Sequence, residues 1–163
     1  MTETEFKKII GRFIERPIPG RKLFIWHGYK EKLFPLLPQK LIADVDILEL
    51  ASNISSSYID SDDNIQRKLR KTVTKKLNEL ISVTDGRQIL VVSNTQLLAR
   101  YKVPLSLFYS NYLTDRTIAI LVVHRVSFKK TLPEYIRFDQ EAVFKLFQNS
   151  LAEENKYNII EEA

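Results

Sequence analysis

The chain contains no cysteine, so disulfide bonds, zinc–thiolate centres, iron–sulfur clusters and cysteine nucleophiles are excluded together. It has no apolar run of about eighteen residues, and no charged-then-apolar leader with a small-residue cleavage site. We therefore expect no membrane segment, and a cytoplasmic location is the default expectation.

Glycine is also scarce, and the four glycines are Gly11, Gly20, Gly28 and Gly86. A phosphate-binding loop needs several closely spaced glycines so that backbone N–H groups can surround an anion, followed by Lys and Ser or Thr. Only Gly28 follows a strong strand pattern, and Tyr29 and Lys30 come directly after it. The sequence therefore predicts that a nucleotide-binding loop is absent.

The composition is that of a globular protein. With 163 residues, of which 44% are hydrophobic, the chain is long enough for a single domain over residues 1–163. Phe6, Ile10 and Phe13 recur at helical spacing and predict a helix within residues 1–16. Residues 153–163 are polar, and we expect this tail to fray.

Three apolar runs predict strands that are buried on both faces: residues 23–26, 89–92 and 117–124. A shorter run at residues 46–50 predicts a further strand. Helical patterns lie between these runs, and the clearest starts at residue 61 and continues to residue 81. Strands that alternate with helices predict a three-layer α/β/α fold with a mostly parallel sheet of four or five strands.

In parallel sheets, binding and catalytic residues usually lie at the carboxyl ends of the strands. The candidates at or near that edge are His27, Gly28, Lys30, Lys32, Asn94, His124 and Arg125. Neither a nucleophile nor a set of carboxylates accompanies the two histidines at the ends of their strands, so the pattern favours structural or surface roles for both. An enzyme that uses His27 or His124 is the alternative. We predict neither a metal site nor a cofactor.

The strongest charge pattern lies in the helix over residues 65–81, where six basic residues fall within ten positions. They are Arg67, Lys68, Arg70, Lys71, Lys75 and Lys76. A cationic helix releases condensed counterions when it meets a polyanion, so the pattern predicts contact with DNA, RNA or an acidic protein. A solvated helix kept soluble by its charges is the alternative explanation.

Several segments match one protein family in order along the chain. Residues 89–98 (ILVVSNTQLL) are similar to its Walker B strand and the start of the next helix, and residues 132–137 (LPEYIR) are similar to its late Pro-Glu-Tyr segment. Residues 46–50, 104–107 and 115–119 are similar to segments that belong to other strands and helices of that family. The chain in this way resembles the P-loop-containing BrxF-like component of BREX bacteriophage-exclusion systems, and more broadly a reduced RecA/AAA-type ATPase core.

The resemblance implies a P-loop NTPase-like fold in a larger assembly with ATPase or DNA-modifying subunits. Two departures stand out: the phosphate loop is missing at residues 27–32, and Asn94 stands where that family carries an acid. A neutral amide cannot offset a divalent ion. The resemblance thus implies a degenerate ATPase that serves as a non-catalytic adaptor in phage defence or DNA processing. Direct nucleic-acid binding through residues 65–81 is the alternative.

Overall fold

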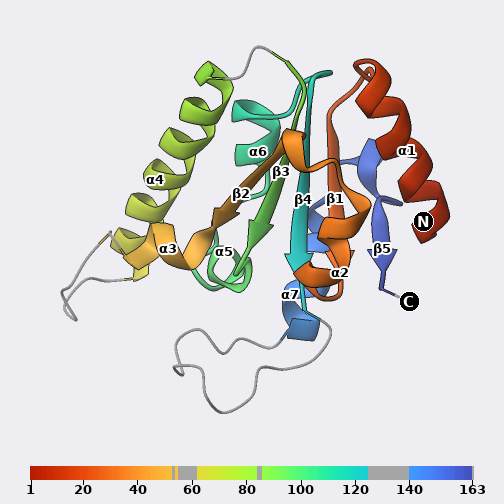
Figure 1. Ribbon diagram of the computed structural model, residues 1–163. Coiled ribbons are helices and arrows are strands. Elements are labelled where there is room, and N and C mark those ends of the chain that lie inside the picture. Colours follow the sequence, from red (N-terminus) through yellow and green to blue (C-terminus); the bar gives the residue numbers. More distant parts are fainter. Residues whose placement is uncertain (53, 55–61, 84–85, 125–139, 163) are drawn as a thin grey trace.

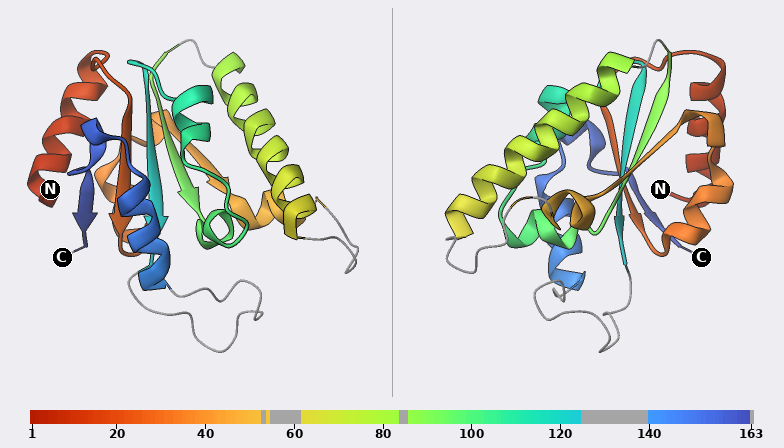
Figure 2. Two further views of the ribbon diagram at one scale, coloured as in Figure 1. Left: turned by 180° about the vertical axis from the view of Figure 1, so that it is seen from behind. Right: turned by 60° about the vertical axis from the view of Figure 1, so that its left-hand side comes forward.

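A parallel sheet of five strands forms the middle layer of the protein, in the order β2-β3-β4-β1-β5 (Figure 1). The computed structural model describes residues 1–52, 54, 62–83, 86–124 and 140–162. Helices cover both faces of the sheet, as the two further views in Figure 2 show. The predicted three-layer α/β/α fold is therefore confirmed.

The strands are β1 (Lys22–His27), β2 (Ile42–Asp46), β3 (Gln88–Ser93), β4 (Thr117–Val123) and β5 (Ile159–Glu161). The α-helices are α1 (Glu3–Glu15), α2 (Lys30–Leu33), α3 (Ile47–Ser52), α4 (Asp62–Val83), α5 (Gln96–Arg100), α6 (Ser106–Asn111) and α7 (Gln140–Ser150). Short 3₁₀ helices occur at η1 (Phe34–Leu36), η2 (Gln39–Leu41) and η4 (Glu153–Asn155).

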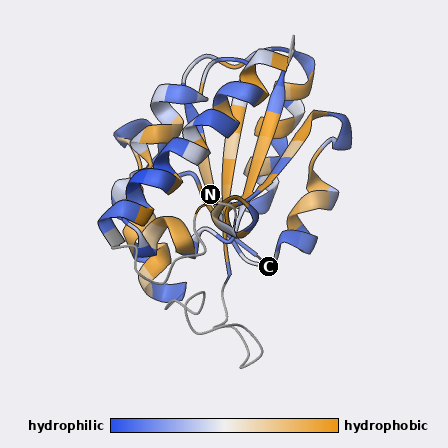
Figure 3. Cartoon of the chain, turned by 90° about the vertical axis from the view of Figure 1, so that its left-hand side faces the viewer, coloured by the Kyte–Doolittle hydropathy of each residue, from blue (hydrophilic) through white to orange (hydrophobic). Residues whose placement is uncertain are grey.

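The central strands are apolar because both of their faces are covered, and successive side chains point to opposite faces. In β1, Leu23 and Ile25 belong to the core that α4 and α7 complete, whereas Phe24 and Trp26 belong to the core under α1. Figure 3 shows hydrophobic residues on the strands and on helix faces that meet them. The apolar runs predicted for β1, β3 and β4 are confirmed.

Helices α1 and α4 pack against the sheet through apolar side chains that recur at helical spacing. The side chain of Thr2 accepts the N–H of Glu5, and the carboxylate of Glu5 accepts the N–H of Thr2, so α1 begins with a complete capping box. In α4, Leu69, Val73 and Leu77 recur at helical spacing and are buried in the core. Leu80 and Ile81 of α4 are partly buried and pack against the same core.

The prediction of a strand over residues 46–50 is wrong, because β2 ends at Asp46 and α3 begins at Ile47. Asp46 Oδ1 accepts the N–H of Leu48 at 2.9 Å, which satisfies a donor in the first turn of α3. The apolar run after Asp46 is therefore one side of a helix, with Ile47 fully buried.

The prediction of a frayed tail is wrong for the described part of residues 153–163. Strand β5 pairs in parallel with β1, with Ile159 opposite Ile25, and Ile160 is fully buried. Before it, the buried side chain of Asn155 donates to Arg21 O and Tyr109 Oη, both at 2.8 Å. The tail is thus part of the sheet.

Some sequence features lie outside the described residues. They are the candidate Arg125, the resemblance segment 132–137 and the helix start at residue 61.

We predict that Asn155→Ala lowers the free energy of unfolding by about 1–3 kcal/mol, because it removes the buried amide that donates to both Arg21 O and Tyr109 Oη. Denaturant unfolding followed by circular dichroism measures this. Tyr157→Ala is the control, since that side chain is 74% exposed, and its effect should stay within about 0.5 kcal/mol. Equal stability of Asn155→Ala and the wild type would mean that the tail is not anchored in this way.

Candidate functional site

The carboxyl ends of β1 and β4 form the switch point of the sheet. After β1 the chain leads to β2 on one side, and after β4 it leads to β5 on the other side of β1. The helices that follow these two strands, α2 and α7, pack against opposite faces. Ligands of open parallel sheets bind where the connections diverge in this way. His27, Gly28 and Tyr29 lie here after β1, and His124 lies here after β4.

The turn after β1 is held by hydrogen bonds on both sides. Gly28 N–H donates to the carbonyl of Val123 at 2.9 Å, which extends the β1–β4 pairing by one residue. The indole N–H of Trp26 donates to the carbonyl of Tyr29 at 2.9 Å. The turn is therefore tied to both β4 and the buried core.

A carboxylate of the chain itself occupies the inner side of this turn. Glu162 Oε2 accepts the N–H of Tyr29 at 2.7 Å, and the Glu162 N–H donates to the carbonyl of His27 at 3.0 Å. A Cβ atom placed on Gly28 would lie 2.3 Å from Glu162 Oε2. One backbone donor that could hold a phosphate at this junction, the N–H of Tyr29, is therefore bonded to a carboxylate of the chain itself.

His27 is fixed from two directions. Its Nδ1 lies 2.8 Å from Glu161 Oε2, and its ring stacks on Phe144 of α7 with 4.0 Å between the ring centroids. Glu161 belongs to β5, so these contacts join β1, β5 and α7 at one point. Such an arrangement holds the imidazole in place as part of the packing.

His124 lies on the other side of the switch point, with its ring 5.8 Å from that of Tyr29. Burial lowers the pKa of His124 below the usual value, and the carboxylates of Glu31 and Glu162 partly offset this effect. At neutral pH the imidazole is therefore uncharged, so it does not attract a phosphate as a cation would.

The two lysine candidates near the turn do not converge on it. Lys30 Nζ lies 2.9 Å from Asp44 Oδ2 of β2 and 5.2 Å from the centre of the Phe34 ring. Lys30 is thus engaged across the sheet face, toward β2. Lys32 is exposed on α2. Arg125, the last candidate after β4, is outside the described part of the chain.

Asn94 connects the ends of β2 and β3. Its backbone adopts a positive φ of 55°, which asparagine tolerates better than most residues. Its Nδ2 donates to Asp46 Oδ1 at 2.6 Å, and its Oδ1 accepts from Gln96 Nε2 at 3.2 Å. Because Asp46 also caps α3, Asn94 acts as the joint between two strands and a helix. Both polar ends of its amide are occupied in this network.

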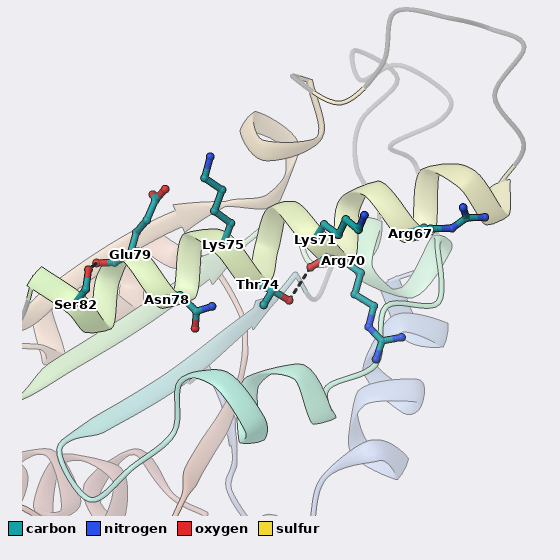
Figure 4. A pocket seen from close by; sticks show the side chains of 8 residues that line it. All are labelled: Arg67, Arg70, Lys71, Thr74, Lys75, Asn78, Glu79 and Ser82. Carbon is teal, nitrogen blue, oxygen red and sulfur yellow. Dashed lines mark hydrogen bonds between the residues drawn. The ribbon is translucent and has the colours of Figure 1, made fainter.

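Helix α4, which carries the six basic residues, is separate from the switch point and lies on the face of the sheet opposite α1 and α2 (Figure 2). Figure 4 shows a pocket lined by eight residues of this helix, four of them basic: Arg67, Arg70, Lys71 and Lys75. Two hydroxyls of the pocket, on Thr74 and Ser82, donate back to carbonyls of α4. The long basic side chains are therefore the groups that a partner would meet.

Most of these basic side chains form no ion pair within the described part of the protein. Among its ion pairs, none involves Arg67, Arg70, Lys71, Lys75 or Lys76. Arg67, Arg70, Lys71 and Lys75 are exposed, whereas Lys68 and Lys76 are half-buried. We call the six residues Arg67, Lys68, Arg70, Lys71, Lys75 and Lys76 the basic face of α4.

Comparisons with protein-family models, curated proteins and solved structures found no match. Within the described residues, no helix is long and apolar enough to span a bilayer. The same residues contain no group of three or more His, Asp or Glu side chains arranged to hold a metal ion.

Sequence reasoning missed the partners that fill the carboxyl edge. Glu161 and Glu162 lie more than 130 residues from His27 and Tyr29, and no local pattern marks such a contact. Asp46 did carry a signal, because Asp46 and Glu49 have the spacing of a capping box, which indicates a helix start and not a strand.

We predict that Gly28→Ala destabilises the fold by about 1–3 kcal/mol, because the new Cβ would lie 2.3 Å from Glu162 Oε2 and 2.4 Å from Glu162 Cβ. Combining it with Glu162→Gly, which removes both atoms, should recover most of the loss that Gly28→Ala causes alone. Denaturant unfolding of the variants measures this coupling.

The matched control is Gly11→Ala in α1, where an added Cβ meets nothing within 4 Å. Alanine in a helix should raise the free energy of unfolding there by about 0.5–1 kcal/mol. An unchanged stability of Gly28→Ala would mean that Glu162 does not occupy the inner side of the turn.

Proposed function

We propose that this chain is a non-catalytic interaction subunit with an ATPase-like α/β scaffold, and that the basic face of α4 is its contact surface. The proposal rests mainly on one hydrogen bond. Tyr29 N–H donates to the Glu162 carboxylate at 2.7 Å, so this backbone donor at the switch point is already occupied. The resemblance of residues 89–98 to a Walker B segment supports an assembly of the phage-defence or DNA-processing kind.

The polar groups at the carboxyl edge support a non-catalytic role. A phosphoryl-transfer site needs backbone donors, a lysine and a metal-binding acid turned toward one point. Here Lys30 pairs with Asp44 of β2, and Asn94 bonds to Asp46. These groups are engaged with other side chains, and among the described residues they do not converge on one point.

The exposed charges of α4 support a contact surface there. Like charges on one helix repel each other, and an anionic partner relieves this repulsion while it releases counterions. A row of basic side chains also speeds the encounter with an anionic partner through long-range attraction. The basic face is therefore suited to recognise an acidic surface.

Direct binding of nucleic acid is the second candidate, and it is favoured because five of the six basic side chains form no ion pair with any described residue. The two candidates use the same surface, and a test of the captured material for nucleic acid distinguishes them. For duplex DNA, the logarithm of the binding constant falls by about 0.9 per neutralised phosphate for each tenfold rise in salt. Affinity that hardly changes with salt would exclude this candidate.

We predict that Arg67→Glu/Lys71→Glu/Lys75→Glu abolishes capture of the partner by the full chain, because it changes the charge of the exposed side of α4 by about six units. The measurement is affinity purification from the native host, with mass spectrometry of bound proteins and a test for nucleic acid.

The matched control reverses three exposed charges elsewhere on the molecule, as Lys8→Glu/Arg12→Glu/Lys40→Glu on α1 and η2. It has the same net charge as the α4 variant, and we expect it to retain the partner. Retention by the α4 variant, or equal loss in both variants, would contradict the proposed contact surface.

A further inference from the structure

An apolar hollow lies between the connection from α5 to α6 and helix α7. One wall consists of Leu98, Val103, Pro104 and Leu105, and the other contains Leu146 and Phe147. Its volume is about 190 Å³, whereas an apolar cavity of about 150 Å³ already holds a benzene ring. The hollow therefore has room for one large apolar side chain.

Leu146 is a large apolar side chain that lines the hollow and is partly exposed to solvent. Its side chain is 46% exposed, although Val143 and Phe147 of the same helix are buried in the core. A single exposed leucine is ordinary on a protein surface. An exposed leucine on the rim of an apolar hollow instead provides a contact for a side chain that enters the hollow.

The hollow adjoins the basic face of α4. Gln66 Nε2 of α4 donates to the carbonyl of Lys102 at 3.1 Å, and Lys102 also lines the hollow. Arg70 follows Gln66 by one helical turn, so the two side chains lie on the same side of α4. A chain that contacts Arg67 and Arg70 can therefore reach the hollow by passing Lys102.

Lys102 occupies a backbone position that glycine would normally take. Lys102 follows the end of α5 and has a φ of 55°. The N–H of the next residue, Val103, donates to the carbonyl of Leu98 in α5 at 2.9 Å. This geometry is that of a helix C-terminus, where glycine avoids the strain of a side chain. A lysine there adds a positive charge to the rim of the hollow at the expense of local strain.

We infer that the hollow and the basic face of α4 together bind an acidic amphipathic segment of a partner protein. One large apolar side chain of that segment enters the hollow beside Leu146, and its carboxylates meet Lys102, Arg67 and Arg70. This inference rests on the proposed function, since it assigns a chemical class to the partner of that same surface.

The walls of the hollow favour a protein segment over nucleic acid. Single-stranded nucleic acids bind by stacking bases on exposed aromatic rings. The ring in this hollow belongs to Phe147, which is only 1% exposed, and the other apolar walls are aliphatic side chains and proline. Apolar anchors with acidic neighbours are a property of amphipathic protein segments.

The experiment replaces Leu146 in the full chain with the photo-crosslinking residue p-benzoylphenylalanine, in the native host, and sequences the cross-linked product by mass spectrometry. We expect a peptide with an excess of Asp and Glu around at least one large apolar residue. A cross-link to nucleic acid, a neutral or basic peptide, or no cross-link overturns the inference.

A synthetic copy of the cross-linked peptide then serves as the probe in solution. Leu146→Asp should weaken its binding by about tenfold or more, because a carboxylate would replace the apolar contact. Lys102→Gly should weaken it by about two- to fivefold, as expected for an exposed charge at the edge of an interface. Lys102→Gly should also be at least as stable as the wild type, so its weaker binding would not reflect unfolding.

The proposed function and the role of the hollow can be tested separately. Partner capture that survives Leu146→Asp but is lost on charge reversal of α4 overturns this inference and leaves the proposed function in place. Capture that survives the charge reversal overturns both.

Discussion

The parallel pairing of β1 with β4 and β5 is the contact on which the rest of the structure depends. The side chains from Leu23 to Trp26 are at most 1% exposed, so the strand forms part of both cores at once. Its backbone is hydrogen-bonded on both sides. This pairing sets the turn at Gly28 beside the end of β4, and it brings the C-terminal residues of the described chain to the same turn.

That arrangement places two carboxylates, and so negative charge, at the carboxyl edge of the sheet. Where a nucleotide-binding protein would offer donors and cations, this chain has the carboxylates of Glu161 and Glu162, which bond to His27 and to Tyr29 N–H. A phosphate would have to displace a carboxylate and approach its neighbour, and like charges at that range repel strongly. The excess of positive charge is found instead on α4, where it is open to a partner. The proposed contact surface on α4 is thus separate from the carboxyl edge of the sheet.

The parts of the fold that could be predicted from sequence are those that depend on local patterns. Residues 89–92 predict β3 because they are continuously apolar, and Leu69, Val73 and Leu77 predict the buried side of α4 because they recur at helical spacing. Strand β2 escaped prediction because it is at the sheet edge, where only Val45 is buried. Strand β5 was not predicted because three residues are too few to show a pattern, and the strand forms through its pairing with β1, which is distant in sequence.

The candidate site was predicted less well for the same reason. The position of His27 and His124 at one edge follows from the order of strands, and the structure places them there. What each candidate contacts depends on residues distant in sequence: Glu161 for His27, Asp44 for Lys30 and Asp46 for Asn94. No spacing rule relates such residues, so their roles emerged only from the folded chain.

The central claim is that the carboxyl edge is closed to nucleotides by the chain's own side chains. The most direct test is titration of the full chain with magnesium-ATP, followed by the backbone amide resonances of Tyr29, Lys30 and His124 in NMR spectra. The account predicts that these resonances do not shift in a saturable manner at millimolar nucleotide. Saturable, magnesium-dependent shifts at these amides with micromolar affinity would contradict it.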